Sequence, residues 1–153
     1  MKITTVITTR SKSCSVKTLH TILKLNIECI QRGVQNEIIY VNDDPFDKID
    51  TIQRCLPNCD RLFFIDFGVN VDEESVKQIF EKHEGLGVLV FPGVKEGIDW
   101  GLFKHKVKEG SEEPVSQMGL NFDTEVGNKI SENIYSVTST NPRSWVMFSK
   151  NVI

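Results

Sequence analysis

The feature that most constrains this chain is a short apolar run over residues 62–65 that ends in an acidic side chain. The run reads Leu-Phe-Phe-Ile, and Asp66 follows it directly. It is too short for a typical helix and rich in aromatic and branched residues, so it predicts a buried strand. A carboxylate there is costly to bury without a positive partner. Ligands of open α/β sheets bind where strands end. We therefore expect Asp66 to be functional; the alternative is that it only shapes the turn.

A second acidic turn follows a second apolar run. Residues 37–41 read as a strand, and Asn42, Asp43 and Asp44 come directly after it. Two parallel strands that end in carboxylates place several negative charges along one edge of a sheet. Such an edge typically holds a cation, a sugar or ribose hydroxyl, or a base amide.

Strands and helices alternate over the first 93 residues. The predicted strands are 2–9, 37–41, 62–65 and 87–91, and the predicted helices between them are 15–32, 45–56 and 72–85. This alternation predicts an α/β fold with a mostly parallel sheet covered by helices.

The apolar residues of the first predicted helix cluster on one side. Val16, Leu19, Leu23 and Ile30 lie near one face, with Ile22 and Ile27 beside them. This spacing is typical of a helix that packs on a core.

The second half of the chain reads differently. Residues 94–128 are rich in glycine and charge, which predicts an irregular segment, although its aromatic residues argue against complete disorder. Two strand-like runs follow, at 134–138 and 144–148. With 153 residues and no linker, we expect one domain over 1–153, made of a 1–93 part and a 94–153 part.

Composition excludes several classes of function. A net charge of −3, without a dense run of Lys or Arg, gives no support to nucleic-acid binding. No segment is long and apolar enough for a membrane span, and the first residues read as a strand, not as a signal peptide. The four cysteines form no Cys-x-x-Cys pair, so we expect free thiols and a cytoplasmic location.

The order of these motifs resembles the nucleotide-binding half of a GT-A fold glycosyltransferase, nearest to the family 2 group. The motifs that carry the resemblance are Thr8-Thr9-Arg10, Val41-Asn42-Asp43-Asp44-Pro45, Ile65-Asp66-Phe67-Gly68 and Val71-Asp72-Glu73-Glu74. Each motif alone is weak, and the signal lies in their order and spacing over residues 2–92. The resemblance implies a Rossmann-like GT-A three-layer sandwich with a mostly parallel central sheet.

The resemblance also implies a function. The chain would move a sugar from a nucleotide-diphosphate sugar donor to a hydroxyl of a saccharide or glycoconjugate acceptor. Asp66 would sit at the ribose and at a divalent metal, Mn²⁺ or Mg²⁺, which neutralises the leaving diphosphate. The residues implied to bind the nucleotide are Thr8, Thr9, Arg10, Asp43, Asp44 and Asp66.

Two departures from the family pattern leave alternatives open. Gly68 stands where the second carboxylate of Asp-x-Asp is expected. The metal role then falls to Asp66 alone or to Asp72, or the domain is metal-independent or inactive. The chain also ends soon after residues 144–148, as in a compact variant, one domain of a larger protein or a trimmed form.

An inverting transferase needs a carboxylate to take the proton of the acceptor hydroxyl. The candidates for this catalytic base are Asp99, which precedes Trp100, Asp123, which follows Phe122, and Glu125. For each of them the alternative is a solvated loop acid.

Two rival functions remain. A non-catalytic GT-A-like domain would bind a nucleotide sugar or a partner without turnover, as Gly68 and the short C-terminal part suggest. A nucleotidyltransferase is the weaker rival, because that group carries a Gly-rich loop after its first strand and residues 8–12 contain no glycine.

Overall fold

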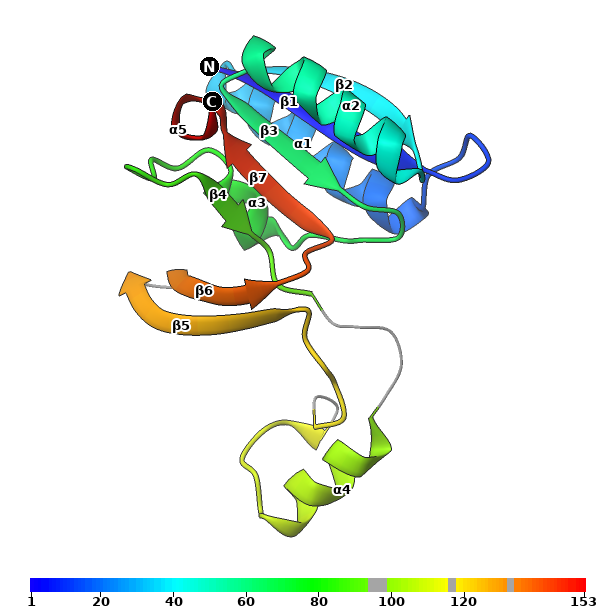
Figure 1. Ribbon diagram of the computed structural model, residues 1–153, viewed down its shortest axis with the longest axis vertical. Helices are drawn as coiled ribbons and strands as arrows, with labels where there is room; N and C mark the ends of the chain where they lie inside the picture. The colour runs from blue at the N-terminus through cyan, green and yellow to red at the C-terminus, as the bar shows by residue number, and fades with distance from the viewer. Residues whose placement is uncertain (94–98, 116–117, 132–133) are drawn as a thin grey trace. The chain divides into compact units, whose positions relative to one another are not determined.

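A five-stranded sheet, in the order β2-β1-β3-β7-β4, organises the first of two units in this computed structural model (Figure 1). β1 pairs in parallel with both β2 and β3, whereas β7 pairs antiparallel with β3 and β4. The strands are β1 (Lys2–Thr9), β2 (Gln35–Asn42), β3 (Arg61–Ile65), β4 (Val88–Val90) and β7 (Ser144–Phe148). The predicted α/β fold with a mostly parallel sheet is confirmed.

The structure describes residues 1–93, 99–115, 118–131 and 134–153. The first unit comprises Met1–Phe91 and Arg143–Ile153, and the second comprises Pro92–Pro142. The strand predicted over 144–148 thus returns to the first unit, where it separates β3 from β4.

Helices cover both faces of the first unit's sheet. Phe63 and Ile65 pack in a cluster that includes residues of α1 (Val16–Arg32) and α3 (Glu73–Gln78). Leu62 and Phe64 point the other way, into a cluster with Cys55 of α2 (Pro45–Cys55). Successive side chains of a strand face opposite sides, so the run 62–65 is apolar at every position because both faces of β3 are buried.

Short helices complete this unit. A 3₁₀ turn, η1 (Leu56–Asn58), follows α2, and α5 (Ser149–Val152) follows β7. Asp72 caps α3 by accepting a hydrogen bond from the Ser75 N–H. The predicted helix over 72–85 is too long, because Ile79 and Phe80 donate to carbonyl oxygens only three residues back and the α-helix gives way to a tighter turn.

α1 turns a different face to the sheet from the one its spacing predicts. Its buried residues are Thr18, Thr21, Ile22, Leu25 and Cys29. The Thr18 hydroxyl donates to the Val69 carbonyl oxygen at 3.0 Å, and the Thr21 hydroxyl accepts from the Val71 N–H at 2.9 Å. These bonds satisfy backbone groups beneath the helix, which explains why two threonines lie in its core-facing stripe. Ile22 alone of the predicted face is buried; Val16, Leu19, Leu23, Ile27 and Ile30 are exposed.

The second unit contains more regular structure than the sequence predicts. It holds α4 (Trp100–Lys108) and an antiparallel hairpin of β5 (Thr124–Ser131) and β6 (Ile134–Thr140). The prediction of an irregular segment over 94–128 is therefore wrong for 100–108 and for the start of β5. Residues 94–98 and 116–117 of that segment lie outside the described residues. A capped helix of only nine residues, with Gly101 in its first turn, gives little periodic signal.

In the part of the chain that the structure describes, no helix combines the length and the apolar character needed to cross a membrane.

Replacing Phe63 tests whether the doubly buried strand supports the fold. Its side chain is fully buried and meets the Phe91 ring edge-on at 6.1 Å between centroids. Phe63→Ala should lower the free energy of unfolding by about 3–5 kcal/mol, because it leaves a cavity in the core. Urea unfolding measures this loss.

Phe46→Ala is the matched control, because the Phe46 side chain is 83% exposed. It should change stability by less than about 0.5 kcal/mol. Equal losses in the two variants would contradict this account of the core.

Candidate functional site

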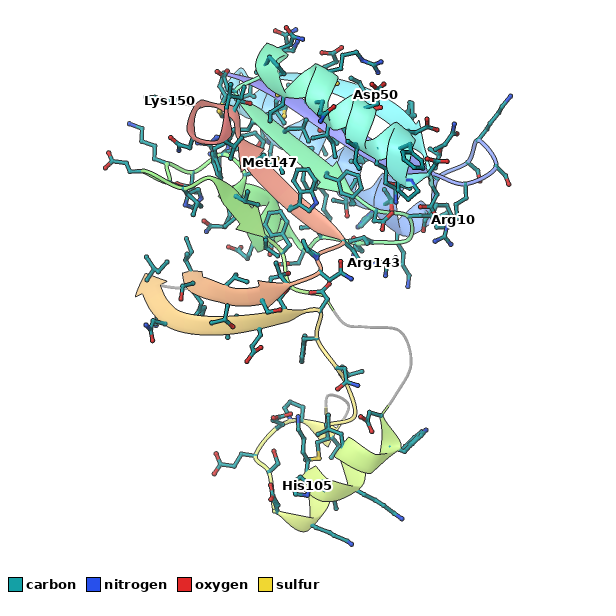
Figure 2. The ribbon with its side chains drawn as sticks, in the orientation of Figure 1. Arg10, Asp50, His105, Arg143, Met147 and Lys150 are labelled. Carbon is teal, nitrogen blue, oxygen red and sulfur yellow. The ribbon has the colours of Figure 1, made fainter. Side chains whose placement is uncertain are left out.

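Four charged side chains meet at the carboxyl ends of the three parallel strands. Arg10 follows β1, Asp43 follows β2, Asp66 follows β3, and Lys48 lies in the first turns of α2. We call these four residues the carboxyl-edge cluster. They converge because parallel strands end at one edge of a sheet, where α/β folds place their ligands. Figure 2 shows Arg10 and Arg143 at this end of the first unit.

Asp43 is the centre of the cluster. Its Oδ2 accepts from the Arg10 Nε at 2.8 Å, and its Oδ1 accepts from the Lys48 Nζ at 2.8 Å. The same ammonium lies 3.6 Å from Oδ1 of Asp66. The hydrogen bond from Lys48, and then that from Arg10, hold the pKa of the Asp43 carboxyl below its ordinary value. The cluster thus alternates positive and negative groups and has no net charge.

The turn after β3 is held from two sides. Asp66 accepts the Phe67 N–H at 2.9 Å through its own carboxylate, while its N–H donates to the Arg143 carbonyl oxygen at 2.9 Å. The Arg143 Nη2 donates to the Phe67 carbonyl oxygen at 2.6 Å, and the Arg10 guanidinium lies 4.6 Å from the centre of the Phe67 ring. Gly68 has φ +79°, which explains a glycine at this position. A third cation, Arg143, therefore lies beside the cluster.

The side chains of Thr8, Thr9 and Asp44, which were also predicted to bind a nucleotide, make no contact with the other charged groups of the cluster among the bonds of the described residues. Thr8 is fully buried, and no hydrogen-bond partner for its hydroxyl lies among the described residues. The Thr9 hydroxyl donates to the Val41 carbonyl oxygen at 3.1 Å. Asp44 caps α2 by accepting from the Phe46 and Asp47 N–H groups. Of the predicted residues, the structure brings Arg10, Asp43 and Asp66 together through side-chain contacts.

A hollow of about 710 Å³ lies beside the cluster on the side of the edge strand β2. Residues from the ends of β1 and β2, the turn after β1, and α2 line it, among them Thr9, Lys12, Asn42, Asp47 and Arg54. Small-molecule sites commonly enclose about 300–1,000 Å³. Its lining includes the sequence neighbours of Arg10, Asp43 and Lys48 but none of the four cluster residues themselves. A larger hollow of about 1040 Å³ lies at the other end of the strands, beside the start of β3 and the end of β7.

The two predicted catalytic acids belong to the second unit and cap local structure there. Asp99 is the N-cap of α4 and accepts from the Leu102 N–H at 3.0 Å. This bond is the main reason that its carboxyl pKa lies below the ordinary value. Asp123 accepts from the Gly93 N–H at 2.9 Å and from the Thr124 hydroxyl at 2.8 Å through Oδ1. Its other oxygen, Oδ2, is buried, and none of the described residues bonds to it. A catalytic role for either acid stays a prediction.

The side chains at the edge, as arranged, do not fit a divalent metal. Lys48 lies against both carboxylates, and both oxygens of Asp43 are paired with cations. Over the described ranges, no three His, Cys, Asp or Glu side chains gather as a metal site would require. A metal at Asp66 would have to compete with the Lys48 ammonium for the same oxygen. Mn²⁺ or Mg²⁺ at Asp66 stays a prediction.

Sequence reasoning missed Lys48 and Arg143. Lys48 lies one helical turn after the acidic turn at Asp43 and Asp44, a spacing that places a helix side chain back toward the strand end. That signal was available in the sequence. Arg143 comes from far along the chain, and only the insertion of β7 beside β3 brings it to this edge.

Comparisons of the chain with models of protein families, with curated proteins and with solved structures found no match.

The ion pairs of Asp43 predict a specific pH dependence of stability. A carboxyl whose pKa is lowered on folding stabilises the fold above its unfolded pKa, and this contribution is lost as the pH falls through the folded value. Asp43→Asn should therefore cost about 1 kcal/mol at pH 7, the scale of partly exposed ion pairs. The difference from wild type should shrink once the pH falls below the ordinary aspartate value of about 4, and it should vanish below the folded value. Urea unfolding across this pH range measures it.

Asp50→Asn is the control for this series, because Asp50 is exposed and only approaches Arg54 one turn away, at 3.6 Å. It should differ little from wild type at any pH. A deficit of Asp43→Asn that stays constant down to about pH 3 would contradict the ion-pair account.

Proposed function

We propose that the carboxyl-edge cluster binds the diphosphate of a nucleotide-diphosphate sugar and that the chain is a GT-A-like glycosyltransferase. The convergence of Arg10, Lys48, Asp43 and Asp66 at the ends of three parallel strands carries the proposal. The motif resemblance over residues 2–92 points in the same direction.

The charges at this edge suit a diphosphate. Arg10 and Lys48 are balanced by carboxylates only while no ligand is bound, and Arg143 adds a further positive group nearby. An arriving diphosphate can exchange with Asp43 for the two cations, since phosphate oxygens form the same charge-assisted hydrogen bonds as a carboxylate. Freed carboxylate oxygens can then accept hydroxyls of the ribose or sugar.

The hollow beside β2 gives room for the nucleoside. It adjoins Thr9 and Asn42, whose strands lead directly into Arg10 and Asp43. A nucleoside there would place its phosphates toward the cluster and its base among polar side chains of α2. The amide of Asn42 and the carboxylate of Asp47 offer hydrogen-bonding groups of the kind that distinguish bases.

The proposed reaction is transfer of the sugar to an acceptor hydroxyl. The acceptor oxygen forms a bond to the anomeric carbon, and the bond from that carbon to the diphosphate oxygen breaks. The nucleoside diphosphate leaves with the bonding electron pair, and Arg10 and Lys48 would stabilise its charge. A carboxylate takes the acceptor's proton. Asp99 and Asp123 stay the candidates for that base.

A second candidate function is binding of the nucleotide sugar without turnover. The contacts of Asp99 favour it, because this carboxylate caps α4 and its lowered pKa makes it a weaker base. Release of nucleoside diphosphate in the presence of sugar acceptors separates the two functions.

Thermal unfolding with UDP-, GDP- and TDP-sugars, in EDTA and with Mn²⁺, tests the binding site. One donor at about 100 times its dissociation constant should stabilise the wild type by roughly 2.7 kcal/mol. Arg10 and Lys48 would hold the diphosphate without a metal, so this should happen in EDTA. Lys48→Met should weaken binding about tenfold, because the diphosphate loses one ion pair.

Lys77→Met is the matched control, since Lys77 lies on α3 and pairs only with Glu74 at 3.7 Å among the described residues. It should bind the donor as the wild type does. Stabilisation by no donor would overturn the proposed function. Binding that requires Mn²⁺ would support the metal predicted at Asp66 and contradict the role given to Lys48.

A further inference from the structure

Arg61 is a partly buried cation that has no carboxylate partner among the described residues. It begins β3 opposite Phe148 of β7, and its guanidinium lies 4.7 Å from the centre of the Phe148 ring. None of the ion pairs that the described residues form includes Arg61. Burial lowers the pKa of its guanidinium, an effect that the nearby Asp60 and Glu81 oppose. A desolvated cation is stabilised when an anion pairs with it.

The acid next to Arg61 in the sequence is bonded elsewhere. The Asp60 carboxylate accepts the Lys2 N–H at 2.7 Å. A guanidinium carries five N–H donors. The Nη1 of Arg61 donates to the Ile79 carbonyl oxygen, and the group makes no further hydrogen bond to the described residues. Arg61 therefore has donors to offer to a ligand.

The hollow of about 1040 Å³ at the other end of the strands gives a ligand access to Arg61, which lines it. The charged side chains of its lining are Arg61, Lys82, Lys150, Asp60 and Glu84. Three cations against two carboxylates leave a single positive charge, which one carboxylate of a ligand would balance. A dianion or a nucleoside diphosphate would set additional negative charge beside Asp60 and Glu84, and like charges at short range repel.

We propose that this hollow binds a small organic monocarboxylate, whose carboxylate pairs with the guanidinium of Arg61. A planar guanidinium offers two parallel N–H donors to the two oxygens of a carboxylate. Its contacts with the Phe148 ring and the Ile79 carbonyl oxygen already restrict it, so less side-chain entropy is lost on binding. The hollow shares no residue with the carboxyl-edge cluster. The inference therefore does not depend on the proposed function.

Titration with benzoate at low salt, followed by amide chemical shifts, tests this site. Benzoate carries one carboxylate and no other polar group. The largest changes should fall at 59–61, 82–85 and 148–151, three segments that line the hollow. The dissociation constant should be about 1–10 mM. Benzamide, which has the same shape without the charge, and sulfate, a dianion, should each bind at least about tenfold more weakly.

Two variants of Arg61 separate its shape from its charge. Arg61→Met should weaken benzoate binding about tenfold, because the ion pair is lost. Arg61→Lys keeps the charge but loses the planar fork, so its affinity should lie between those of the wild type and Arg61→Met. Thermal unfolding shows whether each variant is folded.

Arg32→Met is the matched control. Arg32 also lies over a phenylalanine ring, 4.9 Å from the centre of Phe80, but it pairs with Glu28 at 3.0 Å and does not line the hollow. This variant should bind benzoate as the wild type does.

Several results would overturn the proposal. One is benzoate that binds no more tightly than benzamide or sulfate, and another is a set of changes centred outside the three segments. A third is an Arg61→Met variant that binds benzoate like the control. If Arg61→Met does not fold, Arg61→Lys decides, because an affinity equal to that of the wild type would show that the planar fork holds no carboxylate.

Discussion

Burial of β3 on both faces is the constraint on which the first unit depends. Phe63 and Ile65 pack under α1 and α3, while Leu62 and Phe64 pack under α2. The Phe64 ring also stacks on Trp145 of β7, with 5.1 Å between centroids, so the same strand supports its antiparallel neighbour. The strand ends at Ile65, and the turn after it is fixed by hydrogen bonds of Asp66 with the Phe67 N–H and the Arg143 carbonyl oxygen.

The electrostatics of this edge follow from the fold. Three parallel strands deliver Arg10, Asp43 and Asp66 to one place, and Asp44 begins the helix that brings Lys48 back over them. Each carboxylate then has a cation within reach, which limits the cost of gathering like charges. A diphosphate would exchange these internal ion pairs for its own, and the partial exposure of Asp43 and Asp66 leaves water able to solvate the released carboxylates. The proposed binding of a diphosphate relies on that exchange.

The sequence predicted the strands and the edge well because both depend on local pattern. Apolar runs bounded by polar turns located β1, β2 and β3, and the acidic turns located Asp43 and Asp66. It failed where tertiary contacts decide the outcome. Thr18 and Thr21 lie on the buried side of α1 because their hydroxyls bond the loop at 69–71. The spacing of apolar residues in the sequence does not show these bonds. Arg143 reaches the edge only through the pairing of β7 with β3. The spacing of Lys48 from the acidic turn was visible in the sequence. Its contact with Asp43 could be inferred only once the first residue of α2 was known.

The most direct test of the central claim is to map the amide chemical shifts of the chain by NMR while UDP or GDP is added in EDTA. If the carboxyl-edge cluster binds the diphosphate, the largest changes fall in three separate segments, at 8–12, 42–48 and 66–69, together with Arg143. These segments meet only in the folded sheet, so their joint response would locate the ligand. Changes centred on the other end of the strands, around Arg61 and Phe148, would contradict the account. So would the absence of any change at saturating nucleotide.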